Sequence, residues 1–184
     1  MDLSSIEKPI LVDKVLHSND NLFLLNYLFA NGHFKIGINY PRPEARLEKA
    51  LLENVQHAGF NYQTYFEKIG NENEIFSNPL NLYAFIITNQ LSKNLNFKYK
   101  KIIRIGYNYY CRNQHATDHT DSSENNEISI VYNPHTTDGG TKILDKQYPD
   151  IGSQAKIFKS NWLHSSWSTI KDKARVSLNI KFKI

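Results

Sequence analysis

The sequence has little of several features that would point to particular classes of protein. It contains one cysteine, Cys111, so neither an intramolecular disulfide nor a thiolate metal cluster can form. No apolar run approaches the length of a membrane span, and charged residues near the N-terminus leave no apolar core for a signal peptide. These absences predict a soluble, cytoplasmic protein with no membrane partner.

An excess of charge of one sign is also missing. The chain has 22 Lys and Arg against 18 Asp and Glu, which gives a net charge of +4 at pH 7. Its only dense basic stretch, residues 98–101, is typical of a solvated strand end rather than of a phosphate site. Nucleic acid is therefore not indicated as a partner.

What remains is an ordinary globular composition, with 40% hydrophobic and 12% aromatic residues in 184 residues. This length and composition predict one domain over 1–184, with a helical or mixed part at 1–96 and a strand-rich part at 97–184.

Periodicity and capping residues locate the expected elements of both parts. The first part is expected to contain helices over 21–30, 44–57 and 80–91, the last of them capped by Asn78-Pro79, and a strand over 33–39. The second part contains strand-like runs at 102–110, 128–132, 141–144, 155–159 and 174–182, separated by polar loops. Short strands at this spacing predict a sandwich or barrel.

The triplet His119-Thr120-Asp121 is the first candidate for chemistry. On an extended segment, residues two apart face the same side, so His119 and Asp121 can reach one metal ion together. His164 follows a strand-like run and supplies a second imidazole. Two histidines and one carboxylate form the facial triad of non-haem Fe(II) oxygenases, which leaves three coordination positions open. A structural zinc site would close its fourth position, usually with a cysteine.

Polar residues on two further strands could complete such a site. Arg175 and Ser177 share a face of the last strand and could hold an anionic ligand, although a solvated strand face is the alternative. Asn108 and Tyr110 share a face of the strand before the triplet. Ile103, Ile105, Tyr107 and Tyr109 lie on its opposite face and are expected to pack on the helices.

In this order and spacing, the residues resemble the Fe(II)/2-oxoglutarate-dependent dioxygenase superfamily, and in particular its small prolyl-4-hydroxylase-like members. The family's His-x-Asp, His and Arg-x-Ser motifs appear as His119-Thr120-Asp121, His164 and Arg175-Val176-Ser177. A Gly-Gly turn that enters a strand in the family is matched by 138–141.

The resemblance implies a mainly β fold with flanking α-helices: a double-stranded β-helix, or cupin-like jelly roll, with the N-terminal helices packed on one sheet. His119, Asp121 and His164 would hold Fe(II), with His119 and Asp121 at the end of one strand and His164 on a later strand facing them. 2-Oxoglutarate would bind through Arg175 and Ser177, with help from Tyr110 and Asn108. O₂ would be the co-substrate, succinate and CO₂ the co-products, and ascorbate a reductant in vitro.

The resemblance leaves the substrate open. Prolyl hydroxylases usually carry Lys where this chain has Arg175, and the nucleic-acid-demethylating branch usually carries a second Arg where this chain has only Lys181 and Lys183. A protein or peptide side chain is the first hypothesis, a nucleobase or small metabolite the second, and a non-catalytic cupin-like binding module the third. Residues expected near the mouth of the barrel, and so candidates for contact with substrate, are Arg112, His115, Tyr132, Trp162 and Trp167.

Overall fold

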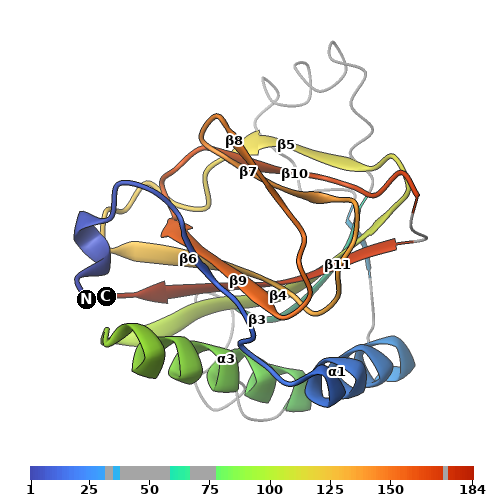
Figure 1. Ribbon diagram of the computed structural model, residues 1–184, viewed down its shortest axis with the longest axis horizontal. Helices are drawn as coiled ribbons and strands as arrows, with labels where there is room; N and C mark the ends of the chain where they lie inside the picture. Colours follow the sequence, from blue (N-terminus) through green and yellow to red (C-terminus); the bar gives the residue numbers. More distant parts are fainter. Residues whose placement is uncertain (32–34, 38–58, 67–77, 172–173) are drawn as a thin grey trace.

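The structure is a computed structural model that describes residues 1–31, 35–37, 59–66, 78–171 and 174–184. Two antiparallel sheets face each other, and two helices cover the outer side of the larger sheet (Figure 1). This arrangement confirms the predicted mainly β jelly roll with helices packed on one sheet.

The larger sheet has seven strands in the order β1-β9-β6-β11-β4-β3-β2. Its strands are β1 (Ile10–Val12), β2 (Lys35–Gly37), β3 (Gly59–Phe66), β4 (Lys101–Cys111), β6 (Glu127–Asn133), β9 (Gln154–Lys159) and β11 (Ala174–Lys183). The smaller sheet has four strands in the order β5-β10-β7-β8. Its strands are β5 (His115–His119), β7 (Gly140–Ile143), β8 (Lys146–Pro149) and β10 (His164–Trp167).

Three further elements come from the N-terminal part of the chain: η1 (Leu3–Ser5), α1 (Ser18–Asn31) and α3 (Pro79–Leu95). Helix α3 begins where the sequence predicts, because the Asn78 side chain accepts a hydrogen bond from the Leu80 amide and Pro79 occupies the first turn. It ends at Asn96, which adopts the left-handed conformation (φ 50°). Residues 44–57, expected to form a helix, lie outside the described residues, as do 33–34 and 38–39 of the strand expected at 33–39.

The hydrophobic core lies between the larger sheet and the helices. Alternate residues of β11 (Val176, Leu178, Ile180 and Phe182) are buried there with Ile105 and Tyr107 of β4. The Tyr107 hydroxyl donates to the Leu80 carbonyl of α3 at 2.8 Å, and the Tyr109 ring meets Phe29 of α1 edge-on. The predicted division into an apolar and a polar face is therefore confirmed for β11 and for β4 from Ile105 to Tyr109. Ile103 does not join this core as predicted, because the register with β11 shifts at this point and Ile102 packs in its place.

The opposite, polar faces of these strands point into the space between the two sheets. Arg175 and Ser177 of β11, 1% exposed each, are buried on this inner face. A small apolar cluster of Val131, Ile143 and Phe158 fills part of the same space. The interior is thus lined by both polar and apolar side chains, which is the surrounding that a reactive site needs.

Candidate metal and 2-oxo acid site

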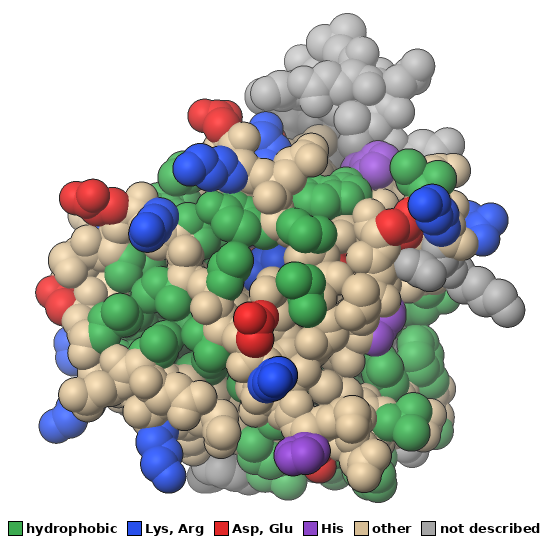
Figure 2. Space-filling view, in the orientation of Figure 1, with side chains coloured by type: hydrophobic (Ala, Val, Ile, Leu, Met, Phe, Trp, Pro, Cys, Tyr) green, Lys and Arg blue, Asp and Glu red, His purple; other side chains and the backbone are tan. Residues whose placement is uncertain are grey.

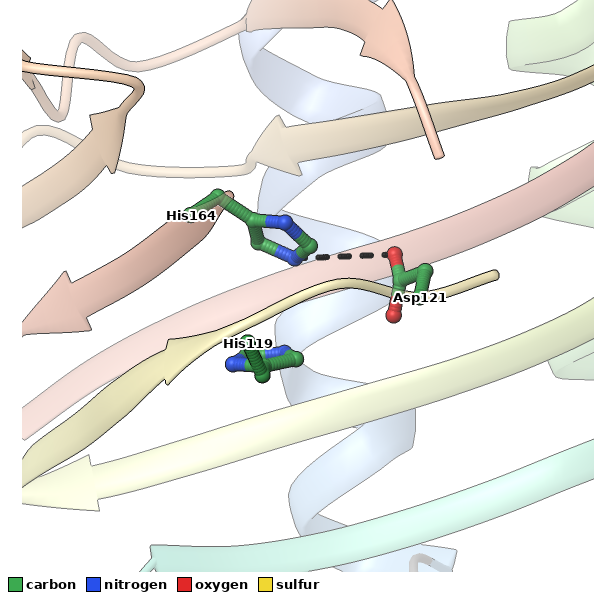
Figure 3. Close-up of side chains that lie close together, drawn as sticks. All are labelled: His119, Asp121 and His164. Atoms are coloured by element: carbon green, nitrogen blue, oxygen red, sulfur yellow. Dashed lines mark ion pairs between the residues drawn. The ribbon is translucent and has the colours of Figure 1, made fainter. Parts of the chain in front are cut away.

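The three predicted metal ligands lie together at one end of the barrel. His119 is the last residue of β5 and His164 the first of β10, and the two are paired across the smaller sheet. Asp121 follows β5, and one ligand atom from each of the three side chains lies within 4.8 Å of the others. Figure 3 shows the two rings and the carboxylate converging on one point.

Backbone carbonyls determine which nitrogen each histidine offers. Nδ1 of His119 lies 2.8 Å from the Thr117 carbonyl oxygen, and Nδ1 of His164 lies 2.9 Å from that of Trp162. Because a carbonyl oxygen can only accept, both Nδ1 atoms carry a proton, and Nε2 is the nitrogen that each ring can offer to a metal. Phe158 meets the His164 ring edge-on with centroids 4.8 Å apart, which further fixes its orientation. Both rings are thus oriented as metal ligands usually are.

Asp121 is held as an anion. Its Oδ1 accepts from Arg104 Nη2 at 2.5 Å, and its Oδ2 accepts from the Ser129 hydroxyl at 2.7 Å. Burial alone raises the pKa of this carboxyl, but the charge of Arg104, the two histidines and the Ser129 hydrogen bond outweigh it, so the pKa lies well below its usual range. Asp121 therefore needs no deprotonation before it binds a cation.

These donors fit Fe(II). Asp121 Oδ2 lies 3.6 Å from His164 Nε2, close to the ~3 Å that separates neighbouring ligands bound about 2.1 Å from one ion. Two imidazoles and one carboxylate suit Fe(II), and the described residues offer no fourth protein ligand at this point.

A second group of charged side chains lies inside the barrel around Arg175. Asp150 pairs with it through two contacts, from Arg175 Nε to Oδ2 at 2.5 Å and from Nη2 to Oδ1 at 3.3 Å. Lys156 Nζ lies 3.2 Å from Asp150 Oδ1 and donates to Asn133 Oδ1 at 2.5 Å. With Lys156 protonated, two cations face one carboxylate, and all three side chains are at most 1% exposed.

Burial and the neighbouring charges together shift the pKa values of Asp150 and Lys156. Desolvation raises the pKa of the Asp150 carboxyl, but Arg175 and Lys156 more than reverse that effect and hold the pKa below its usual range. Burial lowers the pKa of Lys156, Asp150 opposes this, and Arg175 adds to it. An excess of one positive charge in a dry interior is costly, and one further anion would relieve that cost.

The remaining residues predicted to bind 2-oxoglutarate adjoin Arg175. The Tyr110 ring stacks under its guanidinium, 5.5 Å from ring centroid to Cζ. Ser177 and Asn108 are paired across β11 and β4. Ser177 lies two residues from Arg175 along the inner face of β11, and Asn108 lies two residues from Tyr110 along that of β4. Arg175 Nη2 also donates to Thr141 Oγ1 at 3.0 Å, a contact that the sequence pattern did not suggest.

The five tentative substrate residues do not gather at one place. Trp162 is half-buried beside His164, which it orients through its carbonyl. His115 accepts from the Ser168 amide at 3.3 Å, while Trp167 donates to the Asp138 carbonyl at 3.3 Å and packs over Gly140. Arg112 donates to the Lys171 carbonyl at 2.7 Å. Of these, Trp162 lies nearest in the chain to a metal ligand.

Tyr132 was predicted on the wrong side of the sheet. It is fully buried in the core beneath the helices, where its hydroxyl donates to Asn21 of α1. Burial raises the pKa of Tyr132 to about 12, so it remains a neutral donor. Its neighbour Val131, rather than Tyr132, faces the interior of the barrel, because successive strand residues point to opposite faces.

The charged residues of the site that the sequence analysis missed are Arg104, Asp150 and Lys156. Arg104 lies on the polar face of β4 with Asn108 and Tyr110, so strand alternation could have identified it. Lys156 sits in the middle of an apolar run, where a buried cation is unusual. Asp150 lies between β8 and β9 and gives no signal in the sequence.

The surface provides no large basic patch on the face that Figure 2 shows, where Lys and Arg side chains are dispersed among acidic and apolar ones. Among the described residues, no helix is long and apolar enough to cross a membrane.

Comparison with known proteins finds similarity in fold without similarity in sequence. No family model matches the chain, and no curated protein is similar to it. Among solved structures, a 2OG-Fe(II) oxygenase family oxidoreductase from Burkholderia pseudomallei superposes with a TM-score of 0.66 at 12% identity, over 96% of this chain and 85% of that one. A Pseudomonas putida prolyl-4-hydroxylase gives a TM-score of 0.61 at 11% identity, over 96% and 93%.

A viral collagen prolyl hydroxylase from Paramecium Bursaria Chlorella virus-1, solved as a 2OG complex, gives a TM-score of 0.59 at 12% identity over the full length of both chains. The chain therefore has the fold of the 2-oxoglutarate- and Fe(II)-dependent oxygenases, and it carries a His-Asp-His group of the kind that binds iron. The resemblance read from its motifs is thereby confirmed at the level of the fold.

Proposed function

We propose that the protein is an Fe(II)- and 2-oxoglutarate-dependent dioxygenase that hydroxylates an unactivated C–H bond of a protein or peptide side chain. The observation that carries the proposal is the geometry of His119, Asp121 and His164. Two imidazoles with their Nδ1 protons tied to carbonyls present Nε2 beside an ionised carboxylate. A non-catalytic binding module has no need of such a set with three open metal positions.

Fe(II) would be held by these three residues, and 2-oxoglutarate would extend from it to Arg175. The charge excess of Arg175, Lys156 and Asp150 suits the far carboxylate of this co-substrate, because the added anion neutralises the group. Together, iron and 2-oxoglutarate supply the oxidation of the C–H bond, with succinate and CO₂ as co-products. The residues of the chain bind and orient both.

Apolar side chains next to the metal ligands give the site a partly dry wall. Phe158 packs on His164, and Val131 and Ile143 pack on Phe158, which keeps bulk water from one side of the His164 ring. On the outside, Leu163 is 46% exposed directly before His164, and its carbonyl accepts from the amide of Leu144, which is 40% exposed. An apolar rim of this kind fits a peptide side chain better than a phosphodiester backbone.

Several proteins of the same fold are prolyl hydroxylases, as their names state. They include the Pseudomonas prolyl-4-hydroxylase, the viral collagen prolyl hydroxylase and a Trichoplax adhaerens prolyl hydroxylase bound to a hypoxia inducible factor peptide. They support a peptide substrate as the first to test. Arg175, in place of the Lys that prolyl hydroxylases usually use, leaves the identity of the modified residue open.

The testing experiment measures succinate released from 2-oxoglutarate with Fe(II) and ascorbate, in the presence of peptide, tRNA and metabolite pools. Mass spectrometry of the pools should find a gain of about 16 Da in one of them, the mass of an inserted oxygen atom. Absence of both succinate and iron binding would refute the proposal, and a gain in the tRNA or metabolite pool would replace the peptide substrate.

Asp121→Ala is expected to abolish iron binding and turnover, since it removes the only carboxylate of the ligand set. Circular dichroism should still report a folded chain, because Asp121 lies at the mouth of the barrel, beyond the end of β5. A variant at the solvent-exposed Asp145, Asp145→Ala, is the matched control and should bind iron as wild type does. Full activity of Asp121→Ala would mean that the metal site is elsewhere.

A further inference from the structure

The two oxygens of the Asp121 carboxylate have different environments. Oδ2 lies 3.6 Å from His164 Nε2, whereas Oδ1 pairs with Arg104 Nη2 at 2.5 Å. Such a short contact between opposite charges is strong because the carboxylate is only 7% exposed, so little water competes for it, although Arg104 is 27% exposed. Arg104 thus determines which oxygen is turned toward the metal position.

The carboxylate is also fixed from the other side. The Ser129 hydroxyl donates to Oδ2 at 2.7 Å and lies 2.9 Å from the Ser160 hydroxyl, while the Asp121 amide donates to the Ser160 carbonyl at 2.8 Å. A metal ion bound by both oxygens would have to share Oδ1 with the Arg104 guanidinium, which would place two cations on one oxygen. The contacts therefore favour coordination through a single oxygen.

Lys181, a second cation near Asp121, does not orient the carboxylate. Lys181 is paired with Arg104 across β11 and β4, but its Nζ binds Glu127 Oε2 at 3.0 Å and the backbone oxygen of Asp121 at 3.4 Å. Among the Lys and Arg side chains of the described residues, Arg104 alone forms an ion pair with the Asp121 carboxylate. Lys181 therefore provides a neighbouring charge that leaves the carboxylate orientation untouched.

We propose that Arg104 is a positioning residue that keeps Asp121 monodentate and so keeps three coordination positions of the metal open. A six-coordinate ion bound by two imidazoles and one carboxylate oxygen has three free positions, and a bidentate carboxylate would leave two. A 2-oxo acid occupies two positions and O₂ one, so the loss of a single position matters. The inference rests on the metal site of the proposed function.

The test counts water molecules on Mn(II), used in place of iron, from the proton relaxivity of the metal-loaded protein without 2-oxoglutarate. Wild type is expected to hold three exchangeable waters. Arg104→Met removes the donor at similar side-chain length, so the carboxylate can turn and bind through both oxygens. The inner-sphere relaxivity should then fall by about one third. Arg104→Lys, which keeps a cationic donor, should restore most of it.

Lys181→Met is the matched control, because it removes a positive charge from the same pair of strands and should leave three waters. Melting curves identify any variant that fails to fold, and Arg104→Ala then provides the same loss of donor without added apolar bulk. Three waters in the Arg104 variants, or equal losses in the Arg104 and Lys181 variants, would overturn the inference. Absence of Mn(II) binding by wild type would instead count against the metal site itself.

Discussion

At the scale of single residues, two buried carboxylates organise the interior of the barrel. Asp121 lies beside the two histidines, and Asp150 lies between Arg175 and Lys156. Each is surrounded by donors, and each has a pKa below its usual range for that reason. The two differ in their surroundings, because Asp121 Oδ2 lies 3.6 Å from His164 Nε2 whereas Asp150 accepts from Arg175, Lys156 and Thr137.

The role of Lys156 can be tested without breaking the pair between Arg175 and Asp150. Lys156→Met is expected to weaken binding of 2-oxoglutarate to the Co(II)-loaded protein at least about tenfold. The reason is the loss of one charge-assisted contact, worth ~1.5–3 kcal/mol. Isothermal titration calorimetry measures the affinity. Arg175→Ala should weaken binding as well. It also leaves Asp150 with one cation fewer, so it is a less specific test of 2-oxoglutarate binding than Lys156→Met.

Lys142→Met is the matched control, since Lys142 lies on the outer face of β7 and pairs with Asp118 at 3.4 Å. Lys181 is likewise paired elsewhere, with Glu127 at 3.0 Å. Equal affinity of the Lys156→Met variant and wild type would show that Lys156 serves folding only.

How far the site could be predicted from sequence depended on whether its residues follow a strand pattern. His119 and Asp121 are two residues apart on one extended segment, and Arg175 and Ser177 alternate with apolar neighbours, so each pair was visible. Asp150 is unremarkable in sequence, because its surroundings arise from side chains of β9 and β11, on either side of β6, which no local pattern encodes. Tyr132 looked like a site residue because aromatic side chains suit both a core and a binding groove.

At the scale of elements, close packing of β7 against β10 depends on Gly140. A Cβ atom placed there would lie 2.6 Å from the Tyr148 carbonyl oxygen and would also collide with the Trp167 ring. Gly140→Ala is therefore expected to lower the free energy of unfolding by ~1–3 kcal/mol, the usual cost of overpacking. Urea unfolding followed by circular dichroism measures the change.

Gly152→Ala is the comparison, because its nearest contact would be 3.2 Å, from Thr136, at a more open position. It should lower the free energy of unfolding less than Gly140→Ala does. An equal loss of stability from the two substitutions would mean that the contacts with Trp167 and β8 do not restrict position 140 to glycine. The Gly-Gly pair that looked like a family motif would then have another basis.

The elements that sequence patterns located well are those with an apolar face. Strands β4, β6, β9 and β11 were predicted close to their bounds because each buries alternate apolar residues beneath the helices. The residue pattern did not reveal β5 or β8, since β5 (HATDH) and β8 (KQYP) have almost no apolar residues and only partial burial. Their position follows from pairing with β10 and β7, a long-range effect. A strand ending near His119 was expected from the family resemblance alone.

At the scale of the whole molecule, the buried charges make stability depend on acidity. The carboxyls of Asp121 and Asp150 have lower pKa values in the folded chain than in the unfolded one. In acid, the unfolded chain therefore takes up protons before the folded one does. Their contribution to stability is complete above the ordinary carboxyl pKa, about 4, and is lost as the pH falls below it.

The free energy of unfolding of the metal-free protein should therefore decrease as the pH falls from about 5 to about 3. Asp150→Asn should make this decrease shallower, because one of the two carboxyls no longer titrates, although the variant is less stable at neutral pH with Arg175 and Lys156 unopposed. The exposed Asp145→Asn should follow wild type. Urea unfolding in EDTA at a series of pH values gives the slopes directly. A wild-type free energy that stays constant over this range would contradict the lowered pKa values, because only groups that titrate differently in the two states produce a slope.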